Sequence, residues 1–409
     1  MTAKPQDQTL LNPDISRPDA GSGRFLLVLG ILFVAAALRA PFTSVGPLLG
    51  QIRDDLGLTN TLAGFITTLP LLAFALLSPF APQLARRYGL GKILLLAMLA
   101  LSIGILLRSV AGAVTFFAGT ALIGLAIAVC NVLLPGLIKG RFPARIGLMT
   151  GMYTVSMNLC AAAASGFSVP LAGIDGFGWR GTLSLWFIVA VLATVFWIPQ
   201  MKNLVQGNGT RSAAATVTIW RSPLAWQVTL FMGLQSLLYY VLIAWFSVIL
   251  SERGMSSGHA GWILSLMQLA QLPFTFFVPL WAGRLKNQRG LVLITSMLFI
   301  FGILGIWLGG SRWMALWAVC IGIAGGFAFG LAMMFFSLRT RTTQEASELS
   351  GMAQSVGYLL AAAGPALFGL LHDATRSWNA PLALLAGASL LLFVVGMGAG
   401  GDRYVGEQT

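Results

Sequence analysis

Residues 25–49 read FLLVLGILFVAAALRAPFTSVGPLL, an apolar stretch with a single charged side chain, that of Arg39. A transmembrane helix needs about 20 mostly apolar residues, so this stretch is long enough to cross a lipid bilayer. More apolar stretches follow, and the predicted spans are 25–49, 61–84, 93–110, 115–137, 146–171, 180–198, 224–250, 260–282, 290–309, 313–337, 348–371 and 380–400. Continuous apolarity predicts helices, because the strands of a membrane barrel alternate over about 10 residues. The predicted fold class is therefore an all-α integral membrane protein with twelve transmembrane helices.

The composition supports this class and excludes several others. Of the 409 residues, 57% are hydrophobic and 9% are charged, whereas a soluble domain is about 45–50% apolar and about 25% charged. Three cysteines cannot form a disulfide framework in a chain of this length. The net charge of +13 would indicate a nucleic-acid partner in a soluble protein, but membrane proteins collect Lys and Arg in cytoplasmic loops. We therefore expect a lipid bilayer around the chain and no nucleic acid.

The basic residues divide unequally when the N-terminus is placed in the cytoplasm. The inner side receives Lys4, Arg17, Arg24, Arg86, Arg87, Lys92, Lys139, Arg141, Arg145, Lys202, Arg211, Arg221, Arg284, Lys286, Arg289, Arg339, Arg341 and Arg403. The outer loops receive Arg53, Arg108, Arg180, Arg253, Arg312 and Arg376. This asymmetry predicts cytoplasmic N- and C-termini by the positive-inside rule. The expected location is the inner membrane of a bacterium.

The spans predict two six-helix bundles, at 24–198 and 224–401, joined by a cytoplasmic linker at 199–223. We expect cytoplasmic tails at 1–23 and 402–409, the first disordered because it is polar and lacks an apolar core. No predicted loop is long enough for a soluble catalytic domain of about 50 residues. We therefore do not expect an enzyme.

An offset of 200 residues relates the two bundles. The pair Gly151 and Met152 falls on Gly351 and Met352, and Ala161-Ala162-Ala163 falls on Ala361-Ala362-Ala363. These coincidences predict two pseudo-symmetric halves in parallel repeat. Such repeats place a substrate site near the middle of the membrane, at their interface.

Two predicted inner loops carry related basic segments. They read SPFAPQLARRYGLGK at 78–92 and VPLWAGRLKNQRG at 278–290. Both resemble the inner-loop motif of the major facilitator superfamily, G-x-x-x-D-R-x-G-R-K, although Pro82 stands in place of the first Gly and Arg86 in place of the Asp. The resemblance implies a conformational role for Arg86, Arg87, Gly89, Lys92, Arg141, Arg284 and Lys286.

Longer strings are similar to the cyanate porter branch of that superfamily, and most closely to its 2-nitroimidazole transporter members. They are LRAPFTSVGPLL at 38–49, RSPLAWQVTLF at 221–231, SGMAQSVGYLLAAAGP at 350–365 and GLLHD at 369–373. The resemblance implies a small-solute transporter.

Arg39 is the basic residue predicted to lie deep within a span, about 21 Å and 15 Å of helix from the two ends. An Arg at the bilayer centre costs about 2.5–3.5 kcal/mol, and no predicted span contains a mid-membrane carboxylate to pair with it. Its guanidinium fork suits a small or planar anion held by two hydrogen bonds. We interpret Arg39 as the anchor of such a site. The alternative is that Pro41 ends the helix early and Arg39 reaches outward to Asp54 or Asp55.

Other polar and aromatic residues within the spans are candidates for the same site. Tyr239 stands opposite Arg39 in the repeat, and Gln268 and Gln271 share one helix face at a spacing of three residues. The predicted substrate-binding residues are Arg39, Thr43, Asn131, Asn158, Gln235, Tyr239, Tyr240, Gln268, Gln354 and Tyr358. The competing interpretations are interhelical hydrogen bonds for the amides and a lipid-interface belt for Tyr239, Tyr240 and Trp245.

These features predict a secondary transporter that moves a small anion or a polar nitrogen heterocycle by alternating access around a central cavity. A monovalent anion leaving a negative-inside cell gains about 2.3 kcal/mol per 100 mV, so export is the expected direction. A multidrug-type drug/proton antiporter is the alternative, which a buried carboxylate would have favoured. We expect a monomer with a small-molecule substrate, no cofactor and no metal site.

Overall fold

The computed structural model describes residues 21–58, 60–110, 112–203 and 219–407. The predicted N-terminal tail and the centre of the predicted linker lie largely outside these ranges. Within them the chain forms helices and short turns, with no strand.

The first half of the chain supplies six long helices: α1 (Gly21–Thr43), α3 (Asn60–Leu77), α5 (Leu90–Ser109), α6 (Ala113–Arg141), α7 (Ile146–Ala172) and α8 (Gly178–Trp197). Three short helices accompany them: α2 (Leu49–Leu56), α4 (Ala81–Tyr88) and α9 (Gln200–Asn203). The second half supplies α11 (Pro223–Glu252), α12 (Ser257–Ala282), α13 (Arg289–Leu308), α14 (Met314–Leu338), α15 (Thr343–Thr375) and α16 (Asn379–Ala399). In the described residues, 11 helices are long and apolar enough to cross a membrane, or 12 when α3 and α4 count as one broken span. The predicted fold class is confirmed.

Prolines change the ends of the first two predicted spans. The span predicted to run to residue 49 is helical only as far as Thr43, two residues after Pro41, and a 3-10 turn follows at Gly46–Leu48. The span predicted at 61–84 breaks before α4, where Thr68–Leu77 and Ala81–Tyr88 are bent by 53°. Proline lacks the amide hydrogen that continues a helix, and its ring crowds the preceding turn. The first predicted span still lies within one membrane-crossing stretch, Phe25–Leu56, with an irregular turn after Thr43, whereas the second is corrected to a helix followed by a break.

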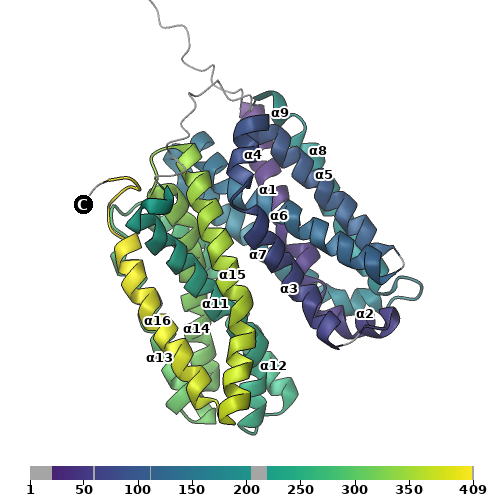
Figure 1. Cartoon of the computed structure of the whole chain (residues 1–409), viewed down its shortest axis with the longest axis vertical. Coiled ribbons are helices and arrows are strands. Elements are labelled where there is room, and N and C mark those ends of the chain that lie inside the picture. Colours follow the sequence, from purple (N-terminus) through teal and green to yellow (C-terminus); the bar gives the residue numbers. More distant parts are fainter. Residues whose placement is uncertain (1–20, 59, 111, 204–218, 408–409) are drawn as a thin grey trace, which may run out of the picture.

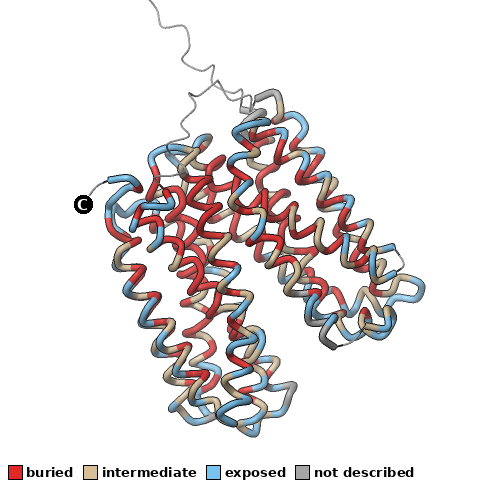
Figure 2. The backbone as a smooth tube through the Cα atoms, in the orientation of Figure 1, coloured by how far each residue is buried: buried red, intermediate tan, exposed pale blue. Residues whose placement is uncertain are grey.

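The two halves form separate bundles that converge at one end of the molecule and diverge at the other (Figure 1). The converging end carries α4, α9 and the C-terminal residues, and the diverging end carries α2 and the start of α12. Buried residues concentrate inside each bundle and where the bundles meet (Figure 2). Large apolar side chains such as Leu96, Ile188 and Val394 are exposed on the surface, which suits surroundings of lipid rather than water.

The 200-residue repeat is visible in the contacts between the bundles. A Cβ added at Gly151 of α7 would lie 2.9 Å from the carbonyl oxygen of Phe276 in α12. A Cβ added at its repeat mate, Gly351 of α15, would lie 2.7 Å from the carbonyl oxygen of Ser78 beside α3. The two repeat-related glycines therefore lie at close approaches between the halves, one contributed by each half.

Candidate substrate site

A cavity of about 520 Å³ lies between the two halves. Residues of α1, α3 and α7 form one wall, and residues of α11, α12 and α15 form the other. The predicted site residues that line it are Arg39, Thr43, Asn158, Tyr239, Tyr240 and Gln268. Small-molecule sites commonly have volumes of roughly 300–1,000 Å³, so this cavity has room for a small organic solute.

A recess of about 20 Å³ adjoins the cavity. The two spaces share Arg39, Tyr239, Tyr240 and Gln271. The recess is completed by Gln235, Ser236, Gly325, Phe329 and Tyr358. Arg39 therefore comes from the first half and faces a group of aromatic and amide side chains from the second.

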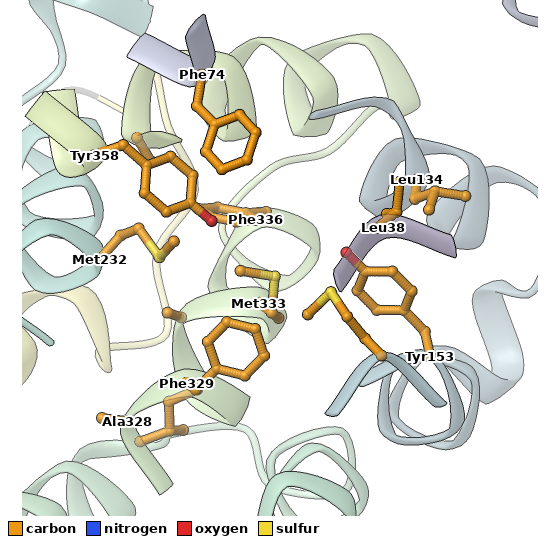
Figure 3. Packing of buried hydrophobic residues seen from close by; sticks show 14 of the residues in the cluster. Leu38, Phe74, Leu134, Tyr153, Met232, Ala328, Phe329, Met333, Phe336 and Tyr358 are labelled. Atoms are coloured by element: carbon orange, nitrogen blue, oxygen red, sulfur yellow. The ribbon is translucent and has the colours of Figure 1, made fainter. Parts of the chain in front are cut away.

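Two aromatic residues that line this recess, Phe329 and Tyr358, are labelled in Figure 3. Tyr358 of α15 packs against Phe74 of α3 in the other half, with ring centroids 5.0 Å apart. Phe329 and Met333 come from α14 and are buried. Tyr358 is 5% exposed and lies between the halves.

Arg39 has an aromatic partner and no ionic one among the described residues. Its Cζ atom lies 5.5 Å from the centroid of the Phe329 ring, a cation–π contact worth about 0.5–2 kcal/mol. The alternative pairing with the outer aspartates does not form, because Asp54 pairs with Arg53 and Asp55 pairs with Arg180, each at 2.7 Å. The guanidinium therefore presents an uncompensated positive charge to the cavity.

Some polar residues that line the cavity or the recess already donate hydrogen bonds within the protein, whereas others have donors without a partner among the described residues. Thr43 Oγ1 donates toward the carbonyl oxygens of Arg39 and Ala161, both 3.1 Å away. Gln235 Nε2 donates to Ser236 Oγ at 2.7 Å. Asn158 Nδ2, by contrast, is buried without a partner in the described part of the chain. Arg39 and Asn158 thus leave donors for a ligand rich in hydrogen-bond acceptors.

Two predicted site residues lie in the contact between the halves. Gln354 Nε2 donates to the carbonyl oxygen of Asn131 at 3.0 Å, and the Tyr153 hydroxyl donates to Asn131 Oδ1 at 3.2 Å. Neither Asn131 nor Gln354 lines the cavity or the recess. In this conformation they join α6 to α15.

Further bonds close the converging end. Lys139 of α6 donates from Nζ to the carbonyl oxygen of Ser337 at 2.8 Å and to Thr340 Oγ1 at 2.9 Å, at the end of α14. It also contacts the Thr340 carbonyl oxygen. The last carbonyls of a helix lack intrahelical donors and carry partial negative charge, so a lysine stabilises them. This one side chain therefore ties the two halves together.

A repeat-related pair of bonds lies between the lysine and the cavity. Thr154 Oγ1 of α7 donates to the carbonyl oxygen of Thr275 in α12 at 2.7 Å. Ser355 Oγ of α15 donates to the carbonyl oxygen of Ala75 in α3 at 2.6 Å. The acceptors, residues 75 and 275, are mates in the 200-residue repeat.

Arg339, the repeat mate of Lys139, stays within its own half. Its guanidinium bonds to Gln288 Oε1, and its carbonyl oxygen accepts the amide of Val405 at 2.8 Å. Burial lowers the pKa of Arg339 to about 10. The two mates therefore differ in their contacts, because of the pair only Lys139 bonds to the other bundle.

The predicted loop-motif residues gather at the converging end. Arg86 of α4 pairs with the buried carboxylate of Glu348 in α15 at 3.8 Å. Gly89 joins α4 to α5 with φ at +92°, a conformation that glycine adopts without strain. The remaining motif residues are exposed or half-buried: Arg87, Lys92, Arg141, Arg284 and Lys286.

The position of Arg108 differs from the one predicted from the sequence. It was expected in an outer loop, but it lies in the last turn of α5 and is 1% exposed. Its Nη1 donates to the carbonyl oxygen of Pro41 at 2.6 Å, whereas Nε and Nη2 have no partner among the described residues. An arginine at the end of an apolar run looks the same in sequence whether it enters a loop or folds under a neighbouring helix. The early end of α1 at Pro41 was the available signal, since terminal helix carbonyls need donors.

Comparison with known proteins agrees with this architecture. Residues 29–365 match the Major Facilitator Superfamily. The chain is 47% identical over 382 residues to an uncharacterized transporter of Bacillus subtilis, covering 93% of this chain and 95% of the relative. It is 43% identical over 387 residues to the 2-nitroimidazole transporter of Escherichia coli, with coverage of 94% and 98%. It is 27% identical over 355 residues to the cyanate transport protein of the same bacterium, with coverage of 86% and 91%.

Solved structures share the fold at low identity. A proton:xylose symporter aligns with a TM-score of 0.73 at 11% identity, covering 94% of this chain and 98% of its own. The Escherichia coli fucose:proton symporter aligns with a TM-score of 0.74 at 12% identity, covering 94% and 99%. The chain belongs to the Major Facilitator Superfamily. It is a multi-pass membrane transporter related to 2-nitroimidazole and cyanate transporters.

Proposed function

We propose that this chain exports a small anion or a polar nitrogen heterocycle through the inner membrane of a bacterium, by alternating access around the central cavity. The observation that carries the proposal is the Arg39 guanidinium, which faces the cavity with no carboxylate partner among the described residues. The half-buried guanidinium of Arg39 cannot lose its charge by deprotonation. An acceptor-rich or anionic cargo would supply the missing partner.

The charges at the converging end support an orientation with this end in the cytoplasm. Exposed Arg87 and Lys92 lie in α4 and at the start of α5. Exposed Arg284 and Lys286 lie just before Gln288, whose backbone amide bonds to the Gly400 carbonyl near the C-terminal residues. The positive-inside rule places such a basic surface in the cytoplasm. The cavity then opens to the outside, and the Lys139 contacts close the inside. Inward opening would break those contacts. The cavity lies within one chain, so a monomer suffices for transport.

The cavity walls also favour an uncoupled mechanism over proton antiport. No described residue that lines the cavity or the recess is Asp, Glu or His. The buried carboxylate of Glu348 lies instead at the converging end, beside Arg86. The membrane potential alone favours exit of a monovalent anion, by about 2.3 kcal/mol per 100 mV. A neutral heterocycle gains nothing from the potential and would follow its own gradient.

Flux measurements on purified protein in proteoliposomes test this function. Labelled cyanate, nitrate and 2-nitroimidazole are compared under an imposed membrane potential, with and without a pH gradient. We expect anion flux to follow the potential and to ignore the pH gradient. Arg39→Met should abolish the flux, whereas Arg312→Met, which removes an exposed loop arginine, should preserve it.

Two results would contradict the proposal. Strict dependence on the pH gradient, particularly with efflux of a cationic dye, would favour the multidrug drug/proton antiporter. Failure of wild-type protein to move any of the three solutes would remove the argument from Arg39.

A further inference from the structure

Gln271 on α12 contacts both the cavity and the recess, and its position is set by two adjacent glycines on α14. A Cβ added at Gly326 would lie 2.5 Å from the backbone carbonyl oxygen of Gln271. A Cβ added at Gly325 would lie 3.2 Å from Oε1 of the Gln271 side chain and 3.7 Å from its Cδ. Gly326 thus lets the Gln271 backbone sit close to α14, and Gly325 leaves room for the amide.

The Gln271 amide is available to a ligand. Its side chain has no hydrogen bond to any residue in the described part of the chain and is half-buried. The neighbouring amides differ from it in contacts or position. Gln235 donates to Ser236 Oγ, and Gln268 is exposed and lines the cavity but not the recess. Gln271 is therefore the amide that shares both spaces with Arg39.

Arg39 and Gln271 give the site two different polar groups, one from each half of the molecule. The guanidinium donates only, whereas the amide both donates and accepts. Between the halves, Tyr239 and Tyr240 line both spaces and pack edge to face, with ring centroids 5.4 Å apart. Such a site can hold the acceptor group of a planar ring at Arg39 and a ring nitrogen at the amide. A triatomic anion needs only the arginine.

We propose that Gln271, whose amide has room because residue 325 is glycine, is the specificity-determining residue that favours a planar nitrogen heterocycle bearing an acceptor group over a bare inorganic anion. The inference rests on the proposed function, because it assumes that Arg39 binds the cargo. 2-Nitroimidazole serves as the heterocyclic probe, since it carries a nitro group, a ring N–H and a ring nitrogen. Cyanate serves as the inorganic probe.

Equilibrium binding of both probes to purified protein measures the preference as a ratio of affinities. Gln271→Leu should weaken 2-nitroimidazole binding roughly three- to tenfold, the usual net value of one hydrogen bond. Cyanate affinity should stay within about twofold, which also shows that the variant is folded. Gln83→Leu, at an exposed glutamine on α4 outside the cavity, is the matched control and should leave both affinities unchanged.

A double-mutant cycle tests the role of Gly325. Gly325→Ala crowds the amide and should lower the preference for 2-nitroimidazole in the wild-type background. In the Gln271→Leu background the same change should have no further effect on the ratio, because the two residues act through one amide. An equal shift in both backgrounds would overturn the role assigned to Gly325.

The outcomes separate this inference from the proposed function. If the wild-type protein binds both probes and the ratio of the two affinities is unchanged in Gln271→Leu, the inference is overturned and the proposed function stands. Wild-type protein that binds neither probe would contradict the proposed function, and the inference with it.

Discussion

Arg108 and Pro41 are separated by 67 residues in sequence, and Arg108 Nη1 donates a hydrogen bond to the Pro41 carbonyl oxygen over 2.6 Å. Pro41 lies in the last turn of α1, two residues after Arg39. The buried arginine of α5 therefore holds the end of the helix that carries the candidate anchor. The two arginines differ in a testable way. Arg108 bonds to Pro41 through one nitrogen, whereas Arg39 lines the cavity and its guanidinium makes no hydrogen bond within the described part of the chain.

We expect Arg108→Lys to keep thermal stability and transport close to those of the wild type. One ammonium group can replace the one nitrogen that bonds to Pro41, and the other two nitrogens of Arg108 make no bond among the described residues. Thermal unfolding in detergent and flux in proteoliposomes check this. A severe loss of both would show that the remaining nitrogens of Arg108 hold a group essential to the fold.

Arg39→Lys should behave differently, although it makes the same chemical change. Lysine keeps the charge but cannot bind a planar acceptor through two parallel hydrogen bonds. Loss of one charge-assisted bond should weaken binding of nitrate and 2-nitroimidazole by roughly 10- to 100-fold. Titration of purified protein with both ligands is the measurement. Wild-type affinity in this variant would exclude the bidentate role.

Lys139→Met should favour opening of the converging end. The variant removes the donor to Ser337 and Thr340, which joins α6 to α14. The reporter is Ser347→Cys in a chain whose three native cysteines are replaced, because Ser347 is buried against Gly136 of the other half. Loss of the Lys139 bonds should remove about 1.5 kcal/mol or more of the free energy that favours the closed end. We therefore expect the thiol at position 347 to react with an impermeant maleimide about tenfold faster.

Arg145→Met is the matched control for Lys139→Met. Arg145 is exposed in the 3-10 turn Pro143–Arg145, which joins α6 to α7 at the same end of the molecule. Its removal should leave the labelling rate unchanged. Equal rates in the two variants would show that the Lys139 contacts do not hold the halves together.

Gly147→Ala and Gly351→Ala should also favour opening, because each adds a Cβ between the halves. The new atom would lie 2.4 Å from the Pro279 carbonyl oxygen in the first case and 2.7 Å from that of Ser78 in the second. Crowding of this kind typically costs about 1–3 kcal/mol, here only in the conformation with the end closed. Faster labelling of the Ser347→Cys reporter is expected in both variants. Gly261→Ala, which meets no atom within 4 Å, should leave the rate unchanged.

The sequence alone was sufficient for the fold class. A membrane span is a local property, since about 20 apolar residues suffice wherever they occur, and the repeat offset correctly predicted two equivalent halves. The errors of the prediction from sequence lay at the ends of helices. The break before α4 shortens one predicted span, and Arg108 lies inside a helix bundle instead of a loop.

Which polar residues share a cavity was decided only by the tertiary structure. Gln268 and Gln271 lie on one helix face, yet only Gln271 reaches the recess beside Arg39, because glycines on α14 make room for it. Asn131 and Gln354 have the same polar character as Asn158, but they bond to each other between the halves. A side chain's surroundings depend on how its helix is rotated and what packs against it. Those contacts join residues far apart in the chain, so no local pattern around Arg39 could name its neighbours.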